Sequence, residues 1–219
     1  MLELETLFEE TQRNGWAAGA MSVVALRNQM EKLRWKGVPI RRSEEFFASL
    51  RPTATEDAPT ASLSAIYGLG NQPLHTDGAH LENPPNIVIL TSELPNATPT
   101  RLWTLAPGNK LPREDFPFHA FGNGVFLVTG QGQNFFSPCL VGGNLRFDPG
   151  CMKACDERAL QVVSYLNAAQ SESVEHDWAT KKGILMIDNQ KTLHSRAAVH
   201  TGDLEREIIR VAVMTQASR

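Results

Sequence analysis

Residues 183–196 read GILMIDNQKTLHSR and join an apolar run to a polar turn and a short returning segment. The apolar residues 183–187 predict a β-strand, which delivers Asp188 and Asn189 to the turn. The chain returns at Leu193 and His194, so this histidine lies at the entrance of a second strand. A histidine in that place is a candidate metal ligand, and a hydrogen-bonded structural histidine is the alternative.

A second polar motif, LHTDG, occupies residues 74–78. Residues two apart on an extended segment share a face, so His75 and Asp77 can point at one centre. With His194 they make two imidazoles and one carboxylate, which leave three adjacent coordination positions open and suit non-haem Fe(II). A surface histidine beside a turn-forming aspartate is the alternative for this pair.

A third motif, REIIR at residues 206–210, falls in the last predicted strand. Alternation places Arg206 and Arg210 on the same side of that strand. Two arginines on an otherwise apolar strand need anionic partners, and a planar guanidinium can clamp a carboxylate with two hydrogen bonds. An edge strand with a solvated charged face, paired with Glu205 and Glu207, is the alternative.

The spacing of apolar residues predicts helices early in the chain and short strands later. We expect helices over 2–13, over 20–36 with Gly37 as C-cap, and over 43–50 with Ser43 as N-cap. Strands are predicted over 62–67, 86–93, 100–105, 124–129, 144–147, 183–188 and 207–214. One late helix over 157–169 has Asp156 as N-cap and Leu160, Val163 and Leu166 as its buried stripe. Many short strands with one late helix predict an antiparallel sandwich or barrel.

The segment 73–210 resembles the taurine dioxygenase and clavaminate synthase-like superfamily, which are Fe(II)- and 2-oxoglutarate-dependent oxygenases. The superfamily signature is His-x-Asp/Glu, then a distal His, then an Arg somewhat more than ten residues later. In this chain those residues are His75, Asp77, His194 and Arg206. The approach to the distal histidine is matched over 188–196, and residues 145–148 resemble the segment before the late helix.

The resemblance also assigns residues to the co-substrate. The second family arginine falls on Arg210, and Thr100 lies where the family has its co-substrate-binding threonine. The sequence ATPT at 97–100 departs from the expected Gly-Gly-x-Thr, so Thr98 competes for that role. The segment between Thr100 and His194 is also shorter than in taurine dioxygenase, which implies a smaller or differently built lid.

These matches imply a mainly β fold with flanking helices, a double-stranded β-helix or jelly roll. They imply one dioxygenase domain over 1–219, with a mostly helical bracing segment over 1–60 and a jelly-roll core over 61–219 that carries one helix near 156–169. His75, Asp77 and His194 are then the catalytic metal ligands for Fe(II). Arg206 clamps the far carboxylate of 2-oxoglutarate with help from Thr100, while Arg210 serves the substrate or the keto-acid end.

The implied activity is that of an oxidoreductase which uses dioxygen to hydroxylate an unactivated C–H bond. We expect a substrate pocket made by the loop after Asp77, residues 124–138 and Arg196 or Arg210. The excess of arginine there indicates a small, carboxylate-bearing, amino-acid-like substrate. Desaturation or ring closure stays open, whereas the acidic ligand Asp77 argues against halogenation. A peptide or protein side chain as substrate, or a cupin-like metal-binding protein without 2-oxoglutarate chemistry, are the alternatives.

Composition excludes several other classes of protein. With 42% hydrophobic and 21% charged residues, the 219-residue chain is close to the globular average, unlike disordered or fibrous proteins. Its net charge of −3 gives no basic surplus for nucleic acid or acidic lipid. We expect no signal peptide and no membrane span. Three cysteines form no disulfide framework, so we expect a cytoplasmic protein.

Overall fold

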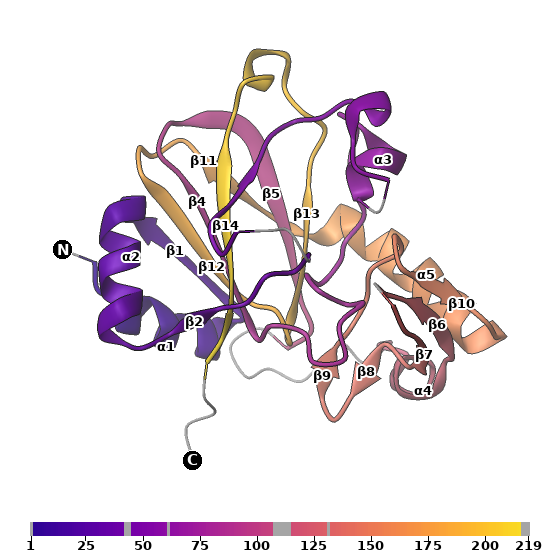
Figure 1. Cartoon of the computed structure of the whole chain (residues 1–219). Coiled ribbons are helices and arrows are strands. Elements are labelled where there is room, and N and C mark those ends of the chain that lie inside the picture. Colours follow the sequence, from indigo (N-terminus) through magenta and orange to yellow (C-terminus); the bar gives the residue numbers. More distant parts are fainter. Residues whose placement is uncertain (1, 42–44, 61, 107–114, 131, 216–219) are drawn as a thin grey trace.

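The computed structural model describes residues 2–41, 45–60, 62–106, 115–130 and 132–215 (Figure 1). Five α-helices lie in these ranges: α1 (Leu4–Asn14), α2 (Val23–Lys32), α3 (Leu63–Tyr67), α4 (Phe118–Asn123) and α5 (Glu157–Ala169). The strands are β1 (Trp16–Ala20), β2 (Lys36–Gly37), β3 (Ala48–Leu50), β4 (Ile87–Ser92), β5 (Asn96–Thr104), β6 (Phe126–Thr129), β7 (Asn134–Ser137), β8 (Leu140–Val141), β9 (Asn144–Leu145), β10 (Met152–Ala154), β11 (Val174–Trp178), β12 (Gly183–Asp188), β13 (Thr192–Arg196) and β14 (Ile208–Met214). Short 3-10 helices are formed by Thr55–Asp57, Gln170–Glu172 and Thr201–Asp203.

The largest sheet has the strand order β1-β12-β4-β14-β2, and β3 also pairs with β14. All of its pairings are antiparallel. Every residue of β4 and β12 is buried. Both faces of these strands are therefore covered, which explains why they read as continuous apolar runs rather than alternating ones.

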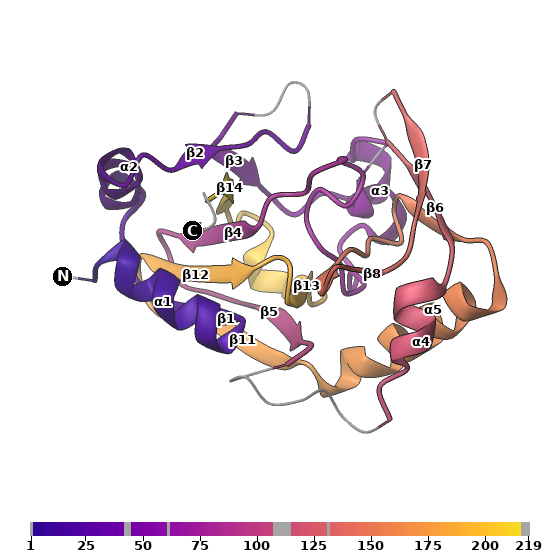
Figure 2. The same ribbon diagram turned by 90° about the horizontal axis from the view of Figure 1, so that it is seen from below.

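A smaller antiparallel sheet, β11-β5-β13, faces the inner side of the large one (Figure 2). Side chains from both sheets meet in one buried cluster, which contains Val88, Leu90, Leu102, Trp178, Leu185, Ile187 and Ile208. Two facing antiparallel sheets with a shared apolar core make the predicted jelly roll, so the predicted fold class is confirmed.

Helices α1 and α2 cover the outer face of the large sheet (Figures 1 and 2). Alternation turns Ile87 and Ile89 of β4 outward, and they pack with Leu4 and Leu7 of α1 and Leu26 of α2. On the other side of the molecule, α4 and α5 pack against the sheet β10-β6-β7 in a separate buried cluster.

The N-terminal 60 residues are less helical than predicted, because they also contribute three strands to the large sheet. Ala20 pairs with Gly183 in β1 instead of opening a helix. Helix α2 begins after Ser22, whose hydroxyl accepts a hydrogen bond from the amide of Ala25, and it ends before Arg34, where φ is 54°. Gly37 is not its C-cap but lies in β2.

Two further elements differ from the prediction. The proposed helix over 43–50 is wrong at its described end, because 48–50 form β3 against β14; its N-cap, Ser43, lies outside the described residues. The predicted strand over 62–67 is the helix α3, which Ser62 caps by accepting from the amide of Ala65. Helices α3 and α4 are thus additional to the single helix expected beyond residue 60.

Helix α5 has the predicted bounds and the predicted cap, since Asp156 accepts a hydrogen bond from the amide of Ala159. Its buried side differs, however. Ala159, Val162 and Leu166 are buried, whereas Leu160 is 58% exposed. Within the described ranges, no helix has the length and apolar character needed to cross a membrane.

Candidate metal centre

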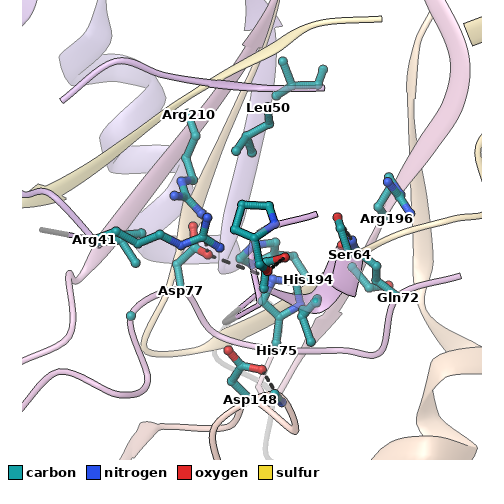
Figure 3. A pocket seen from close by; sticks show the side chains of 18 of the residues that line it. Arg41, Leu50, Ser64, Gln72, His75, Asp77, Asp148, His194, Arg196 and Arg210 are labelled. Atoms are coloured by element: carbon teal, nitrogen blue, oxygen red, sulfur yellow. Dashed lines mark hydrogen bonds and ion pairs between the residues drawn. The ribbon is translucent and has the colours of Figure 1, made fainter. Parts of the chain in front are cut away.

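The backbone brings His75 and His194 together. His75 lies before the loop that contains Asp77, and it forms an isolated antiparallel bridge with His194 of β13. Each residue donates its amide to the carbonyl of the other over 2.9 Å. Their imidazole rings consequently lie 4.5 Å apart, centroid to centroid (Figure 3). The predicted strand entrance at His194 is therefore the place where the motif LHTDG pairs with β13.

The loop after His75 is held by Asn189, from the polar turn between β12 and β13. Its side-chain oxygen accepts from the amide of Asp77 over 2.9 Å, and its amide group donates to the carbonyls of Asp77 and Pro85. Asn189 is 1% exposed, so these bonds are shielded from water. Asn189, which the sequence predicted in this turn, therefore positions the carboxylate of Asp77.

Donor atoms of His75, Asp77 and His194 all lie within 4.8 Å of one another. Two of the atoms in this cluster are buried without a hydrogen-bond partner among the described residues: Oδ2 of Asp77 and Nδ1 of His194. Buried polar atoms are nearly always paired, so orphans in one cluster indicate a missing ligand. Two imidazoles and one carboxylate fit a divalent transition metal.

The electrostatics keep these groups in the form that binds a metal. Burial alone would raise the pKa of Asp77, but Arg210 and the two histidines, with a contribution from Arg41, lower it below its usual value. Burial, with the neighbouring His75, lowers the pKa of His194 to about 3. The carboxylate is thus ionised and this imidazole neutral at neutral pH, as metal ligation requires.

The orientation of His75 is set by a backbone carbonyl. Its Nδ1 lies 3.0 Å from the carbonyl oxygen of Pro73. Since a carbonyl can only accept, Nδ1 carries the proton and Nε2 has a free lone pair. That Nε2 lies 4.0 Å from Oδ1 of Asp77, on the side where the cluster converges. Metal-binding histidines typically donate their other ring N–H to a carbonyl or carboxylate in this way.

The cluster opens into a cavity of about 520 Å³. Every residue predicted for the metal or the co-substrate lines it: His75, Asp77, Thr100, His194, Arg206 and Arg210. Arg206, Ile208 and Arg210 all face it, which agrees with the predicted shared side. Arg206 itself, however, precedes β14, which begins at Ile208.

Arg206 is anchored beside the inner face of β5. Its Nη1 donates to the carbonyl of Thr98 over 3.1 Å. Burial lowers the pKa of Arg206 to about 10, and Asp203 opposes this shift only in part. No ion pair of Arg206 is found among the described residues, so this partly buried guanidinium is available to an anion in the cavity.

Thr98 and Thr100, the two candidates for binding the co-substrate, have different hydrogen-bond partners in the structure. Thr98 donates its hydroxyl proton to Oδ2 of Asp203 over 2.6 Å and accepts from the amide of His200 over 3.0 Å. It does not line the cavity, whereas Thr100 does. Thr100 accepts a hydrogen bond from Nε1 of Trp178 over 3.1 Å.

The walls of the cavity differ in part from the predicted pocket. The loop after Asp77 contributes Gly78 and His80, but the described residues of 124–138 contribute only Thr129 and Gly130. Much of the wall comes instead from described residues between Ile40 and Pro59, in the segment predicted to be a helical brace, and from Ser62, Leu63 and Ser64. That segment brings Arg41, whose side chain extends toward Asp77 in Figure 3.

The arginines of the cavity are not equivalent. Arg196 donates to the carbonyls of Gly68 and Gly70, so it largely serves the backbone of the loop before His75. Arg51 pairs with Glu207 over 3.1 Å. Arg41 has no hydrogen-bond or ion-pair partner among the described residues. No motif in the sequence marked Arg41 or Trp178.

No protein-family model matches the chain, and no curated protein sequence matches it. Solved structures do. An asparagine oxygenase in complex with Fe(II), 2S,3S-3-hydroxyasparagine and succinate superposes with a TM-score of 0.72 at 17% identity, over 97% of this chain and 78% of the other. The chain has the fold of this non-haem iron oxygenase. A second oxygenase of the same fold, OrfP in complex with Fe and alpha-ketoglutaric acid, gives a TM-score of 0.69 at 15% identity, over 97% and 78%.

OrfP in complex with Fe, succinate and (3S)-hydroxy-L-Arg superposes in the same way, with a TM-score of 0.68 at 15% identity, over 97% of this chain and 80% of that one. The match therefore extends from the N-terminal helices to β14. The oxygenase fold accounts for the whole described chain rather than for its β core alone.

Proposed function

We propose that the chain is an Fe(II)- and 2-oxoglutarate-dependent oxygenase that hydroxylates a small, carboxylate-bearing substrate. The observation that carries this proposal is the joint placement of two features in one cavity. The first is the largely buried cluster of His75, Asp77 and His194, and the second is the partly buried guanidinium of Arg206 with the hydroxyl of Thr100. The oxygenase fold supports it.

His75, Asp77 and His194 would hold the iron. Bound iron and 2-oxoglutarate together supply the oxidation: one atom of O₂ enters succinate as CO₂ leaves, and the other enters the substrate as a hydroxyl group. The protein keeps Asp77 ionised through Arg210 and His194 neutral through burial. Asp77 and His194 are also buried, which limits water beside the reacting atoms.

Arg206 would clamp the far carboxylate of 2-oxoglutarate. A guanidinium offers two parallel N–H donors to a carboxylate, and the geometry is specific to arginine. Burial makes the uncompensated cation costly, so an anion in the cavity would be favoured there. This clamp also argues against a cupin-like metal protein, which has no use for a buried carboxylate site.

The substrate would carry an anionic group of its own. Once Arg206 serves the co-substrate, Arg210 pairs with Asp77, and Arg51 and Arg196 have their partners, Arg41 is the cation left with no acceptor in the described part of the cavity. The neighbouring structures hold hydroxylated asparagine and arginine. We therefore infer an amino-acid-like substrate whose carboxylate binds Arg41.

We also retain the expectation of a reducing compartment, the cytoplasm. Cys139, Cys151 and Cys155 are free in the structure. Burial raises the pKa of Cys139 and Cys151 well above the ordinary value, which keeps these thiols unreactive.

The test is succinate release from 2-oxoglutarate by the purified protein with Fe(II) and air, first without a primary substrate and then with a panel of amino acids and small carboxylates. We expect slow release alone, and faster release with a product 16 Da heavier for a carboxylate-bearing member. Absence of succinate under every condition would exclude the function. Stimulation only by peptides would keep the chemistry and change the substrate class.

A further inference from the structure

The hydroxyl of Thr100 already forms one hydrogen bond, with the indole of Trp178. Nε1 of Trp178 lies 3.1 Å from Oγ1 of Thr100, and an indole nitrogen can only donate. Thr100 must therefore accept, and its single proton is left to point elsewhere. Thr100 is 5% exposed and lines the cavity, whereas Trp178 lies behind it in the core.

The indole cannot easily turn away from Thr100. Trp178 is 1% exposed and belongs to the apolar cluster between the two sheets. The ring of His176 packs edge-on against it, with centroids 4.7 Å apart and planes at 86°. On another side Gly183 leaves room for it, since a Cβ there would lie 3.2 Å from Cε3 of the indole. Its N–H is thus fixed in direction.

Thr98, two residues earlier on the same face of β5, shows the opposite arrangement. It donates to Asp203 and accepts from the amide of His200, so its proton is already used. The two threonines have the same chemistry, and only their partners differ. A donor-only neighbour leaves Thr100 a free proton in the cavity that Arg206 also lines, where an anion would need one.

We propose that Trp178 is a positioning residue that turns the Thr100 hydroxyl into a dedicated hydrogen-bond donor to the carboxylate of 2-oxoglutarate. This inference rests on the proposed function. Without the indole N–H, the hydroxyl could rotate or donate its proton inside the core. The co-substrate would then lose part of a charge-assisted hydrogen bond without any change in the residues that touch it.

The experiment is a double-mutant cycle read by calorimetric titration of 2-oxoglutarate into Mn(II)-loaded protein, which needs no turnover. Thr100→Val should weaken 2-oxoglutarate binding by about 10- to 100-fold, and Trp178→Phe by about 3- to 10-fold, in line with a lost and a misdirected hydrogen bond. In the Thr100→Val background, Trp178→Phe should change the affinity less than two-fold, because Trp178 acts only through that hydroxyl. Thermal unfolding should show the destabilisation by Trp178→Phe in both backgrounds.

Equal losses of affinity from Trp178→Phe in both backgrounds would overturn the proposal, because they would mean that Trp178 acts by packing. No loss in the wild-type background would overturn it too. If the Phe variant does not fold, 3-benzothienylalanine at position 178 keeps the bicyclic ring and removes only the N–H. Wild-type protein that fails to bind 2-oxoglutarate would instead refute the proposed function, so the two failures are distinguishable.

Discussion

Arg210 donates a hydrogen bond from Nη1 to Oδ1 of Asp77 over 3.2 Å, with both side chains about 90% buried. The second oxygen of the carboxylate, Oδ2, has no partner among the described residues. Oδ1 thus lies near a permanent cation and near Nε2 of His75, whereas Oδ2 is left unpaired. The arginine that the sequence assigned to the substrate or the keto-acid end holds a metal ligand in this structure, and its contact with either molecule stays a prediction.

This pairing predicts how Arg210→Met behaves. Removing one partner leaves a buried charge uncompensated, so the metal-free protein should lose about 3–5 kcal/mol of unfolding free energy in urea. A divalent cation replaces the lost charge. Saturating Mn(II), at 100 times its dissociation constant, should therefore recover about 2.7 kcal/mol.

The matched control is Arg158→Gln, which removes an exposed arginine 3.8 Å from Asp156. It should change the unfolding free energy by less than about 1 kcal/mol with or without metal, as surface pairs do. If Arg210→Met is no more destabilising than this control, Asp77 does not depend on the ion pair.

The metal ligands give a second prediction. His75→Ala, Asp77→Ala and His194→Ala should each weaken Mn(II) binding by more than 100-fold in a calorimetric titration and abolish succinate formation. The proteins should still fold, because apolar cores rather than a metal support a chain of this length. His119→Ala, which changes an exposed residue of α4, is the control and should bind Mn(II) like the wild type. Near-normal metal binding by any one of the three would remove that residue from the centre.

A third prediction concerns Arg206→Lys, which keeps the charge but loses the two-pronged geometry. The KM for 2-oxoglutarate should rise by about 10- to 100-fold, as expected for a lost hydrogen bond to a charged group. Arg101→Lys, whose arginine pairs with Glu175 outside the cavity, should leave that KM unchanged. An unchanged KM in Arg206→Lys would place the clamp on another residue.

The parts of the fold that the sequence predicted share a physical reason. Strands β4, β12 and β14 are long and buried, so their apolar runs identify them without knowledge of their neighbours. Helix α5 has a capping aspartate at its exact start. The metal ligands occur in compact motifs in which the polar residues lie close together along the chain.

The parts that were missed depend on distant partners. Strand β1 contains Ala17, Ala18 and Gly19, which have little intrinsic strand preference, and it forms because β12 offers an edge. Strand β3 similarly depends on β14. Arg41 enters the cavity and Trp178 reaches Thr100 only through such tertiary packing. No local pattern marks either residue.

The choice between the two threonines gives a fourth prediction. Thr98→Val should lower the unfolding free energy by about 1–3 kcal/mol, because it leaves the buried Asp203 carboxylate and the amide of His200 without the hydroxyl. Its affinity for 2-oxoglutarate should change by less than two-fold. Urea unfolding and calorimetry on the same preparation would test both statements. A large loss of 2-oxoglutarate affinity would show that Thr98 takes part in binding the co-substrate.

The last prediction concerns acid. The pKa of His194 is lowered to about 3 in the folded protein, mainly by burial and then by His75, while an unfolded histidine titrates near 6.5. Between these values the unfolded chain binds a proton that the folded protein excludes, so stability must fall as pH falls. His194 should contribute up to about 1.4 kcal/mol per pH unit, and His176, whose pKa burial also lowers, should add in the same direction. Urea unfolding of metal-free protein from pH 7.5 to 4.5 measures this slope. His194→Gln should flatten it by close to one proton, and an unaltered slope in that variant would show that the buried imidazole is not the group that titrates.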